Sequence, residues 1–344
     1  MKKKTFPGLD LLKFICSILI IFLHINPFPQ PIYFITKAIG NLGVPCFFII
    51  SGFLFFRKLI ATPKEEQTNV FFRQIKRLTI LFVFWQAIYF LISDVWWIQK
   101  GNSWQSILDY AKRLFGGDGF FLWYIGASIV GLIIAFLLWR GIKEWLLLPA
   151  CLLLLAGAIP SAYNPLIAGS FYDTAYQWYC TYFYTVRNGL FFAFPCMSLG
   201  MLLAKKEDAV LHLGKKTCWL LIPSTTLFTG DCLLARFVFQ TRLGTMALSA
   251  TALSFVLVLI FLQLKKEFKT AVWMRRMSFL IYVIHPLWLS ILPKLLSVLS
   301  SWDIDYYWYR YWGVQIPILI VLTITTAWLL ILLSKKIPFV KRIM

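Results

Sequence analysis

The chain has 344 residues, of which 60% are hydrophobic and only 14% are charged, and its mean hydropathy is +0.75. Soluble domains keep about a quarter of their residues charged, so this composition excludes a soluble globular fold and indicates a polytopic membrane protein. The formal net charge of +20 would suit nucleic-acid binding or membrane topology, and the distribution of Lys and Arg along the chain decides between them.

The first apolar run, residues 9–28, carries Lys13 and His24. An ionisable side chain at membrane depth costs about 2.5–3.5 kcal/mol on insertion scales, so such residues usually persist for function. Eleven residues of helix rise about 16.5 Å and turn through about 1100°, so both side chains lie on nearly one face. That face is expected to point into protein or a wet cavity. Asp10 lies one turn below Lys13 and is expected to pair with its ammonium group.

Ten apolar runs of spanning length follow one another along a single membrane domain, residues 1–344. We expect an all-α bundle of about ten transmembrane helices near residues 9–27, 39–56, 78–98, 119–139, 145–161, 188–204, 217–235, 244–264, 277–298 and 312–333. The first run has spanning length and no small-residue cleavage site, so it is expected to be retained and not cleaved as a signal peptide.

The basic residues fit an even number of spans with both termini in the cytoplasm. If both termini are cytoplasmic, the segments expected inside the cell hold about three times as many Lys and Arg residues as the segments expected outside. The positive charge is therefore assigned to topology at the plasma membrane, and no nucleic-acid partner is expected.

Two segments expected outside are dense in Trp and Tyr, namely residues 170–185 and 302–312. They fit an aromatic belt at the membrane surface, which needs no ligand. They also fit a surface that stacks against sugar rings, with nearby carboxylates and Arg310 to hold hydroxyl groups. The sequence leaves both interpretations open.

Among the other His and Cys residues, His285 is one further candidate for a functional residue. His285 lies in an apolar span and is followed by Pro286, which frees a backbone carbonyl one turn earlier and is expected to bend the helix. His212 lies in a Lys-rich inner loop and is expected to be incidental. The seven Cys residues are expected to be small buried hydrophobes, although an outer pair such as Cys151 with Cys180 stays open, and no metal site is expected.

Several motifs, in chain order, resemble those of the membrane-bound acyltransferase family 3. The first is LDLLKFICSILIIFLH, with a basic residue, ten intervening residues and a His. It is followed by LGVPCFFIISGFLFFRKL, NVFFRQIKRL, FLWYI, RNGLFFAFPCMSLGMLLAK and SFLIYVIHPLWL. The resemblance covers essentially the whole chain.

The resemblance implies an integral membrane O-acetyltransferase that moves an acyl group, expected to be acetyl, from cytoplasmic acetyl-CoA to a hydroxyl of a surface glycan or lipid-linked saccharide. The catalytic candidates are Lys13, His24 and His285, with His24 as a base or transient acyl carrier. The candidates for binding the donor share positive charge or a motif position: Ser51, Arg73, Lys76 and Arg77.

The sequence departs from the family pattern at two positions, and the family's residue roles are not assigned there without change. Lys13 stands where most members have Arg, which keeps the charge but loses the planar fork that binds phosphate or carboxylate. Pro45 replaces an acidic residue, so no carboxylate is assigned there. The hydrolase-like domain that some members append is expected to be absent.

A second class of function stays open. Paired charges inside a membrane also suit a transporter of a small polar substrate such as an amino acid. The sequence shows no clear internal repeat and no matching pair of Gly-broken spans, which favours the enzyme.

Overall fold

The computed structural model describes residues 5–24, 32–94, 122–240, 244–264, 269–299 and 312–342. Within these ranges every regular element is a helix, which confirms the all-α prediction. The α-helices are α1 (Pro7–His24), α2 (Ile32–Gly40), α3 (Gly43–Ile60), α4 (Lys64–Tyr89), α7 (Trp123–Ile142), α8 (Leu147–Ala162), α9 (Phe171–Phe183), α10 (Phe194–Lys205), α11 (Glu207–Leu213), α12 (Leu221–Leu233), α13 (Leu248–Leu262), α14 (Ala271–Leu299), α16 (Trp312–Leu333) and α17 (Pro338–Arg342). A short π-helical turn, η4 (Gly189–Ala193), leads into α10.

Several helices are long and apolar enough to cross a membrane, so the chain is a multi-pass membrane protein. Among the described residues, 7 segments meet the length and hydropathy required: Pro7–His24, Phe34–Ile60, Lys64–Ile92, Trp123–Ala162, Glu207–Val238, Ala271–Pro293 and Gln315–Leu333. Trp123–Ala162 contains both α7 and α8, and two further apolar helices, Gly189–Lys205 and Leu248–Leu262, are shorter. Each of the ten expected ranges overlaps a helix, while the count of ten spans and the cytoplasmic termini stay predictions.

Several helix boundaries differ from the sequence prediction, and two of the differences have a clear cause. The second expected span begins at residue 39, but the chain turns at Asn41 and Leu42, so α2 and α3 are separate helices. The third begins at residue 78, but α4 starts at Lys64, because its first turns are helical although their exposed, charged side chains hide them from a hydropathy scan.

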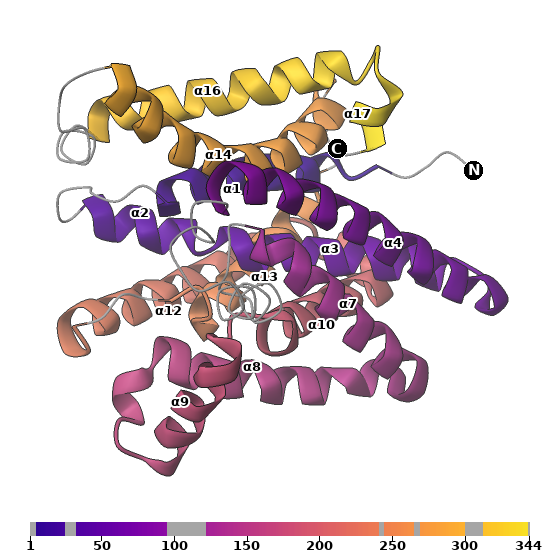
Figure 1. The fold of residues 1–344 in the computed structure, drawn as a ribbon. Helices are drawn as coiled ribbons and strands as arrows, with labels where there is room; N and C mark the ends of the chain where they lie inside the picture. The colour runs from indigo at the N-terminus through magenta and orange to yellow at the C-terminus, as the bar shows by residue number, and fades with distance from the viewer. Residues whose placement is uncertain are drawn as a thin grey trace.

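The helix α1 lies at the centre of the bundle, between α14 with α16 on one side and α3 with α13 on the other (Figure 1). It runs parallel to α14, because Asp10 pairs with Arg275 near the start of both helices and His24 contacts His285 further along. The polar face of α1 is therefore enclosed by protein, as the spacing of its two ionisable residues predicts.

A close backbone contact joins α3 and α10 through two glycines. A Cβ atom added to Gly52 would lie 2.3 Å from the carbonyl oxygen of Met197, and one added to Gly200 would lie 2.2 Å from that of Ile49. Real Cβ atoms do not approach a carbonyl oxygen so closely, so each position requires glycine. Small residues allow membrane helices to approach backbone to backbone, and this contact holds α3 against α10.

We expect Gly52→Ala to destabilise the protein by about 1–3 kcal/mol, because the added methyl group overpacks the α3–α10 contact. The measurement is thermal unfolding of the purified protein in detergent. Gly230→Ala is the matched control, since a Cβ at this position in α12 would meet nothing within 4 Å. Equal unfolding temperatures for the two variants would contradict the proposed close contact.

The cysteines match the prediction only in part. All seven are free, so Cys151 and Cys180 form no disulfide. Four of them are buried as expected, but Cys151 and Cys218 are exposed and Cys180 is half-buried. The exposed pair lies on helices whose neighbouring apolar side chains are also exposed, as expected for side chains that face lipid.

The first aromatic segment forms α9, which begins at the cap residue Ser170. Its Phe171 and Trp178 are 88% and 66% exposed, so this helix presents large aromatic side chains to its surroundings. Asp173 accepts a hydrogen bond from the backbone of Gly169, so this carboxylate stabilises the start of α9. The second aromatic segment, residues 302–311, lies outside the described residues.

Candidate functional site

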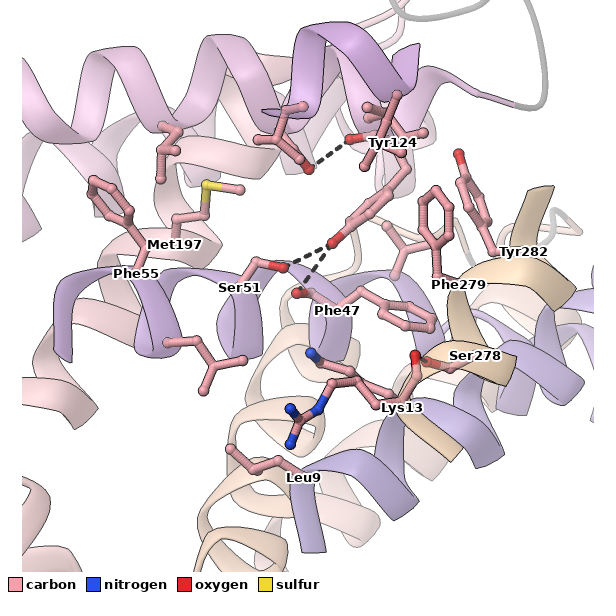
Figure 2. A pocket seen from close by; sticks show the side chains of 18 of the residues that line it. Leu9, Lys13, Phe47, Ser51, Phe55, Tyr124, Met197, Ser278, Phe279 and Tyr282 are labelled. Atoms are coloured by element: carbon pink, nitrogen blue, oxygen red, sulfur yellow. Dashed lines mark hydrogen bonds between the residues drawn. The ribbon is translucent and has the colours of Figure 1, made fainter. Parts of the chain in front are cut away.

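A cavity of about 1380 Å³ runs beside the polar face of α1. Side chains from α1, α3, α4, α7 and α14 form most of its wall, and Met197 of α10 closes one side (Figure 2). Lys13 and His24 both line it, so the two ionisable residues of the first span share one cavity.

One end of the cavity is strongly positive, and we call it the cationic end. It lies at the start of α1, because the guanidinium of Arg57 sits 4.8 Å from the centre of the Phe6 ring, just before that helix. Six cations from α3, α4, α14 and α17 gather there: Arg57, Lys58, Arg73, Arg77, Arg276 and Lys341. Two of them, Arg73 and Arg77, are donor-binding candidates from the sequence, and both line the cavity.

Lys76, the third basic candidate on α4, does not line the cavity and is exposed. Helical spacing explains the difference: Val70, Gln74, Arg77 and Leu81 all line the wall, and position 76 is about 100–160° around the helix from each of them. Lys76 therefore points away from the face of α4 that forms the wall.

Asp10 binds a different partner from the one predicted. Its carboxylate accepts two hydrogen bonds from Arg275, at 2.9 Å from Nε and 2.7 Å from Nη2. Lys13 lies near this pair and interacts electrostatically with both residues, but the ion pair itself is between Asp10 and Arg275. The expected pairing of Asp10 with Lys13 is wrong, because a guanidinium offers two parallel N–H donors that match the carboxylate.

The middle of the cavity is formed by a hydroxyl pair. The hydroxyl groups of Ser51 and Tyr124 lie 2.9 Å apart, and Tyr124 also donates to the backbone oxygen of Phe47 at 3.3 Å (Figure 2). Ser51 thus lines the cavity, and its neighbour Gly52 allows the close α3–α10 contact. The motif around Ser51 therefore has two roles: Ser51 adds a polar group to the cavity wall, and Gly52 allows α3 to pack closely against α10.

The opposite end, which we call the His24 end, is formed where α1 stops. His24 is the last residue of α1, and its exposed side chain lines the cavity. Lys37 of α2 donates a hydrogen bond to the backbone oxygen of Leu23 and lines the same end. Arg187, just before η4, also lines it and lies with its guanidinium 5.0 Å from the centre of the Trp123 ring.

His285 lies behind His24 and does not line the cavity. The two imidazole rings are 5.3 Å apart at their centres. Nδ1 of His285 lies 2.8 Å from the backbone oxygen of Ile281, so it carries the proton and donates it, which leaves a lone pair on Nε2. His285 is 1% exposed, and its Nε2 has no hydrogen-bond partner among the described residues.

The sequence missed several residues that the fold brings to the cavity. Arg275 and Arg276 come from the start of α14, and Lys341 comes from α17, far along the chain from the other cations. Tyr124 lies in the motif FLWYI, and Arg187 lies in the motif RNGLFF. Their positions in these motifs are the sequence feature that could have marked them as site residues. Among the described residues, no group of three or more His, Cys, Asp or Glu side chains could hold a metal ion.

An all-helical bundle with several apolar helices around a polar cavity defines a multi-pass membrane protein with an internal site. The family model described as an acyltransferase domain matches residues 6–333. The chain therefore belongs to acyltransferase family 3, and this membership supports a membrane acyltransferase.

Comparison with curated proteins finds two relatives, both named amino-acid racemase and both from Enterococcus faecalis. One is 29% identical over 205 residues, which are 56% of this chain and 27% of the relative. The other is 22% identical over 291 residues, which are 81% of this chain and 40% of the relative. The chain thus spans less than half the length of either relative. No solved structure matches the chain significantly.

Proposed function

We propose that the protein transfers an acyl group, acetyl in the simplest case, from cytoplasmic acyl-CoA to a hydroxyl of a surface glycan or related cell-envelope acceptor. The observation that carries this proposal is the single cavity that joins the cationic end to His24. A donor held at one end and an acceptor at the other could then react across the plasma membrane.

The cationic end suits the phosphates of CoA. Arg73 and Arg77 offer planar guanidinium groups, which bind phosphate through paired hydrogen bonds, and neighbouring Lys58 adds charge. Arg57 is already ion-paired with Glu207. In this arrangement the flexible pantetheine arm extends along the cavity past Lys13 and carries the thioester towards His24. The expected cytoplasmic position of this end matches the compartment that holds acetyl-CoA.

At the His24 end, the proposed chemistry needs one base. A neutral imidazole nitrogen of His24 removes the proton from the acceptor hydroxyl, and the oxygen attacks the thioester carbonyl carbon. The carbon–sulfur bond then breaks, the ester remains on the acceptor, and the CoA thiolate takes the proton from His24. Atoms and charge balance without a further reactant. The positive charges near His24 stabilise the oxyanion that forms during the transfer.

His285 suits a positioning role, because it touches His24 but not the cavity. We expect His285→Gln to lower kcat by about tenfold, since the imidazole that orients His24 is lost. The bell-shaped pH profile of kcat should also move, because the surroundings of the base have changed. A variant that folds in equal amount and keeps the wild-type rate and pH profile would rule the role out.

A transporter of a small polar substrate such as an amino acid is the second candidate. The cavity is lined by polar groups from its cationic end to its His24 end, and the two curated relatives carry names that refer to amino acids. These relatives are much longer than this chain, so their racemase activity does not follow for it.

One experiment separates the two candidates. The purified full chain is placed in proteoliposomes, and two rates are measured: release of CoA from acetyl-CoA with and without envelope extract, and uptake of labelled amino acids without acetyl-CoA. The enzyme requires CoA release that depends on the acceptor extract. Uptake without any acceptor-dependent CoA release would favour the transporter and contradict the proposed transfer.

A further inference from the structure

The hydroxyl pair of Ser51 and Tyr124 lines the cavity but has no part in the transfer chemistry described above. Serines inside helices commonly bond back to a carbonyl three or four residues earlier in the same helix. Two other serines of the cavity wall, Ser128 and Ser278, do this, with donor–acceptor distances of 2.7 Å and 3.0 Å. The hydroxyl of Ser51 instead meets Tyr124 of the neighbouring helix α7, beside the open cavity (Figure 2).

The pair offers a hydrogen-bond acceptor to a ligand. Each hydroxyl group has one hydrogen and two lone pairs. Tyr124 donates its hydrogen to the backbone oxygen of Phe47, so the hydrogen that joins the two side chains belongs to Ser51. Among the described residues, Ser51 Oγ receives no hydrogen bond. Its remaining capacity is therefore that of an acceptor.

This acceptor is both accessible and held in place. Ser51 and Tyr124 are half-buried, whereas Ser128 and Ser278 are only 3% and 2% exposed. The ring of Tyr124 packs against that of Phe48, with 4.7 Å between their centres. A polar group fixed before its ligand arrives loses little freedom on binding, so it binds at a lower entropic cost.

The pair lies deeper in the cavity than the cationic end, because α3 runs antiparallel to α1. Arg57, near the end of α3, lies over the ring of Phe6, just before α1 begins. At the start of α3, a Cβ added to Gly43 would lie 3.2 Å from Ile20, near the end of α1. Ser51 is six residues before Arg57, which corresponds to about 9 Å along the helix towards the His24 end.

A CoA molecule with its phosphates at the cationic end would extend its pantetheine arm past this position. The arm contains two amides, one nearer the phosphates and one nearer the thioester. An amide N–H that leaves water needs an acceptor, because burial without a hydrogen bond is unfavourable. Ser51 Oγ is such an acceptor, about two helical turns beyond Arg57.

We propose that Ser51 Oγ accepts a hydrogen bond from the N–H of the pantetheine amide nearer the phosphates, and that Tyr124 orients Ser51 for this contact. The inference rests on the proposed function and adds a positioning site for its donor. The contact fixes how far the arm enters the cavity, and so where the thioester lies relative to His24. No covalent bond changes at this site.

The test uses three acetyl donors that differ in the proposed contact. Acetyl-CoA has the phosphates and both amides. S-acetyl-N-(N-acetyl-β-alanyl)cysteamine has both amides without phosphate, and S-acetyl-N-acetylcysteamine has only the amide nearer the thioester. Thiol release that depends on envelope extract is measured for each donor, with the purified full chain in proteoliposomes, and gives kcat/KM.

Ser51→Ala is expected to lower kcat/KM for acetyl-CoA and for the two-amide donor by about three- to tenfold, as for the loss of one neutral hydrogen bond. The one-amide donor should be unaffected, because it lacks the amide that Ser51 binds. Tyr124→Phe should show the same pattern with a smaller loss, since it removes only the group that orients Ser51. Arg77→Gln should affect acetyl-CoA more than either short donor, since only CoA carries phosphate.

Ser128→Ala is the matched control, because it removes a serine hydroxyl of the same wall that is buried and bonded within its own helix. It should leave all three values unchanged. A short donor that does not react is tested as an inhibitor of acetyl-CoA, and its inhibition constant in wild type and Ser51→Ala replaces kcat/KM.

The outcomes separate this site from the proposed function. Thiol release that falls equally for all three donors in Ser51→Ala, or for none of them, would overturn the amide site and leave the acyltransferase standing. The same holds for a two-amide donor that neither reacts nor inhibits. Acceptor-dependent thiol release from none of the donors would overturn the proposed function, and the amide site with it.

Discussion

Replacing His24 with alanine is expected to lower acetyl transfer by about 10²–10⁴-fold, the usual contribution of a general base. The imidazole stands at the end of α1 with its side chain in the cavity, and Lys37 and Arg187 beside it carry charge but supply no base at neutral pH. The measurement is incorporation of label from acetyl-CoA into envelope material in membranes with matched amounts of protein.

The control for this prediction is His212→Ala, because His212 lies on α11, is exposed and does not line the cavity. It should keep the wild-type rate. A rapid acid quench distinguishes the two possible roles of His24, since an acyl carrier leaves labelled acetyl on the protein and a base does not. Undiminished transfer by His24→Ala would end both roles.

The sequence predicts the features that depend on local spacing. Eleven residues between Lys13 and His24 place both on one helical face, and both line the cavity. The apolar runs predict the helices because hydrocarbon requires every backbone polar group to be bonded within its own segment. Arg73 and Arg77, one helical turn apart, share the face that forms the wall, whereas only the structure shows that Lys76 lies off that face.

The features that the sequence does not predict depend on contacts between distant segments. Arg275 binds Asp10 across 265 positions of sequence, so no local pattern could favour it over Lys13. Arg187 and Lys37 converge on His24 only because the start of η4 and the end of α2 lie at the same part of the bundle. For His285, the sequence marks an unusual residue, but only the packing shows that it lies behind His24 and away from the cavity.

The ion pair between Asp10 and Arg275 is expected to have the largest effect on stability. Asp10→Asn keeps the shape of the side chain but removes the charge, so Arg275 and the nearby Lys13 are left to repel each other. We expect the free energy of unfolding to fall by roughly 2–3 kcal/mol. A fully buried pair would cost about 3–5 kcal/mol, but the Arg275 side chain is 46% exposed and therefore partly solvated.

A double-mutant cycle tests this pairing directly. Because each single change already breaks the pair, Asp10→Asn combined with Arg275→Gln should cost little more than the larger single change. Glu144→Gln is the matched control, since Glu144 pairs with Lys205 at an exposed position and such pairs contribute little to stability. Additive effects of the two changes would contradict a stabilising pair between Asp10 and Arg275.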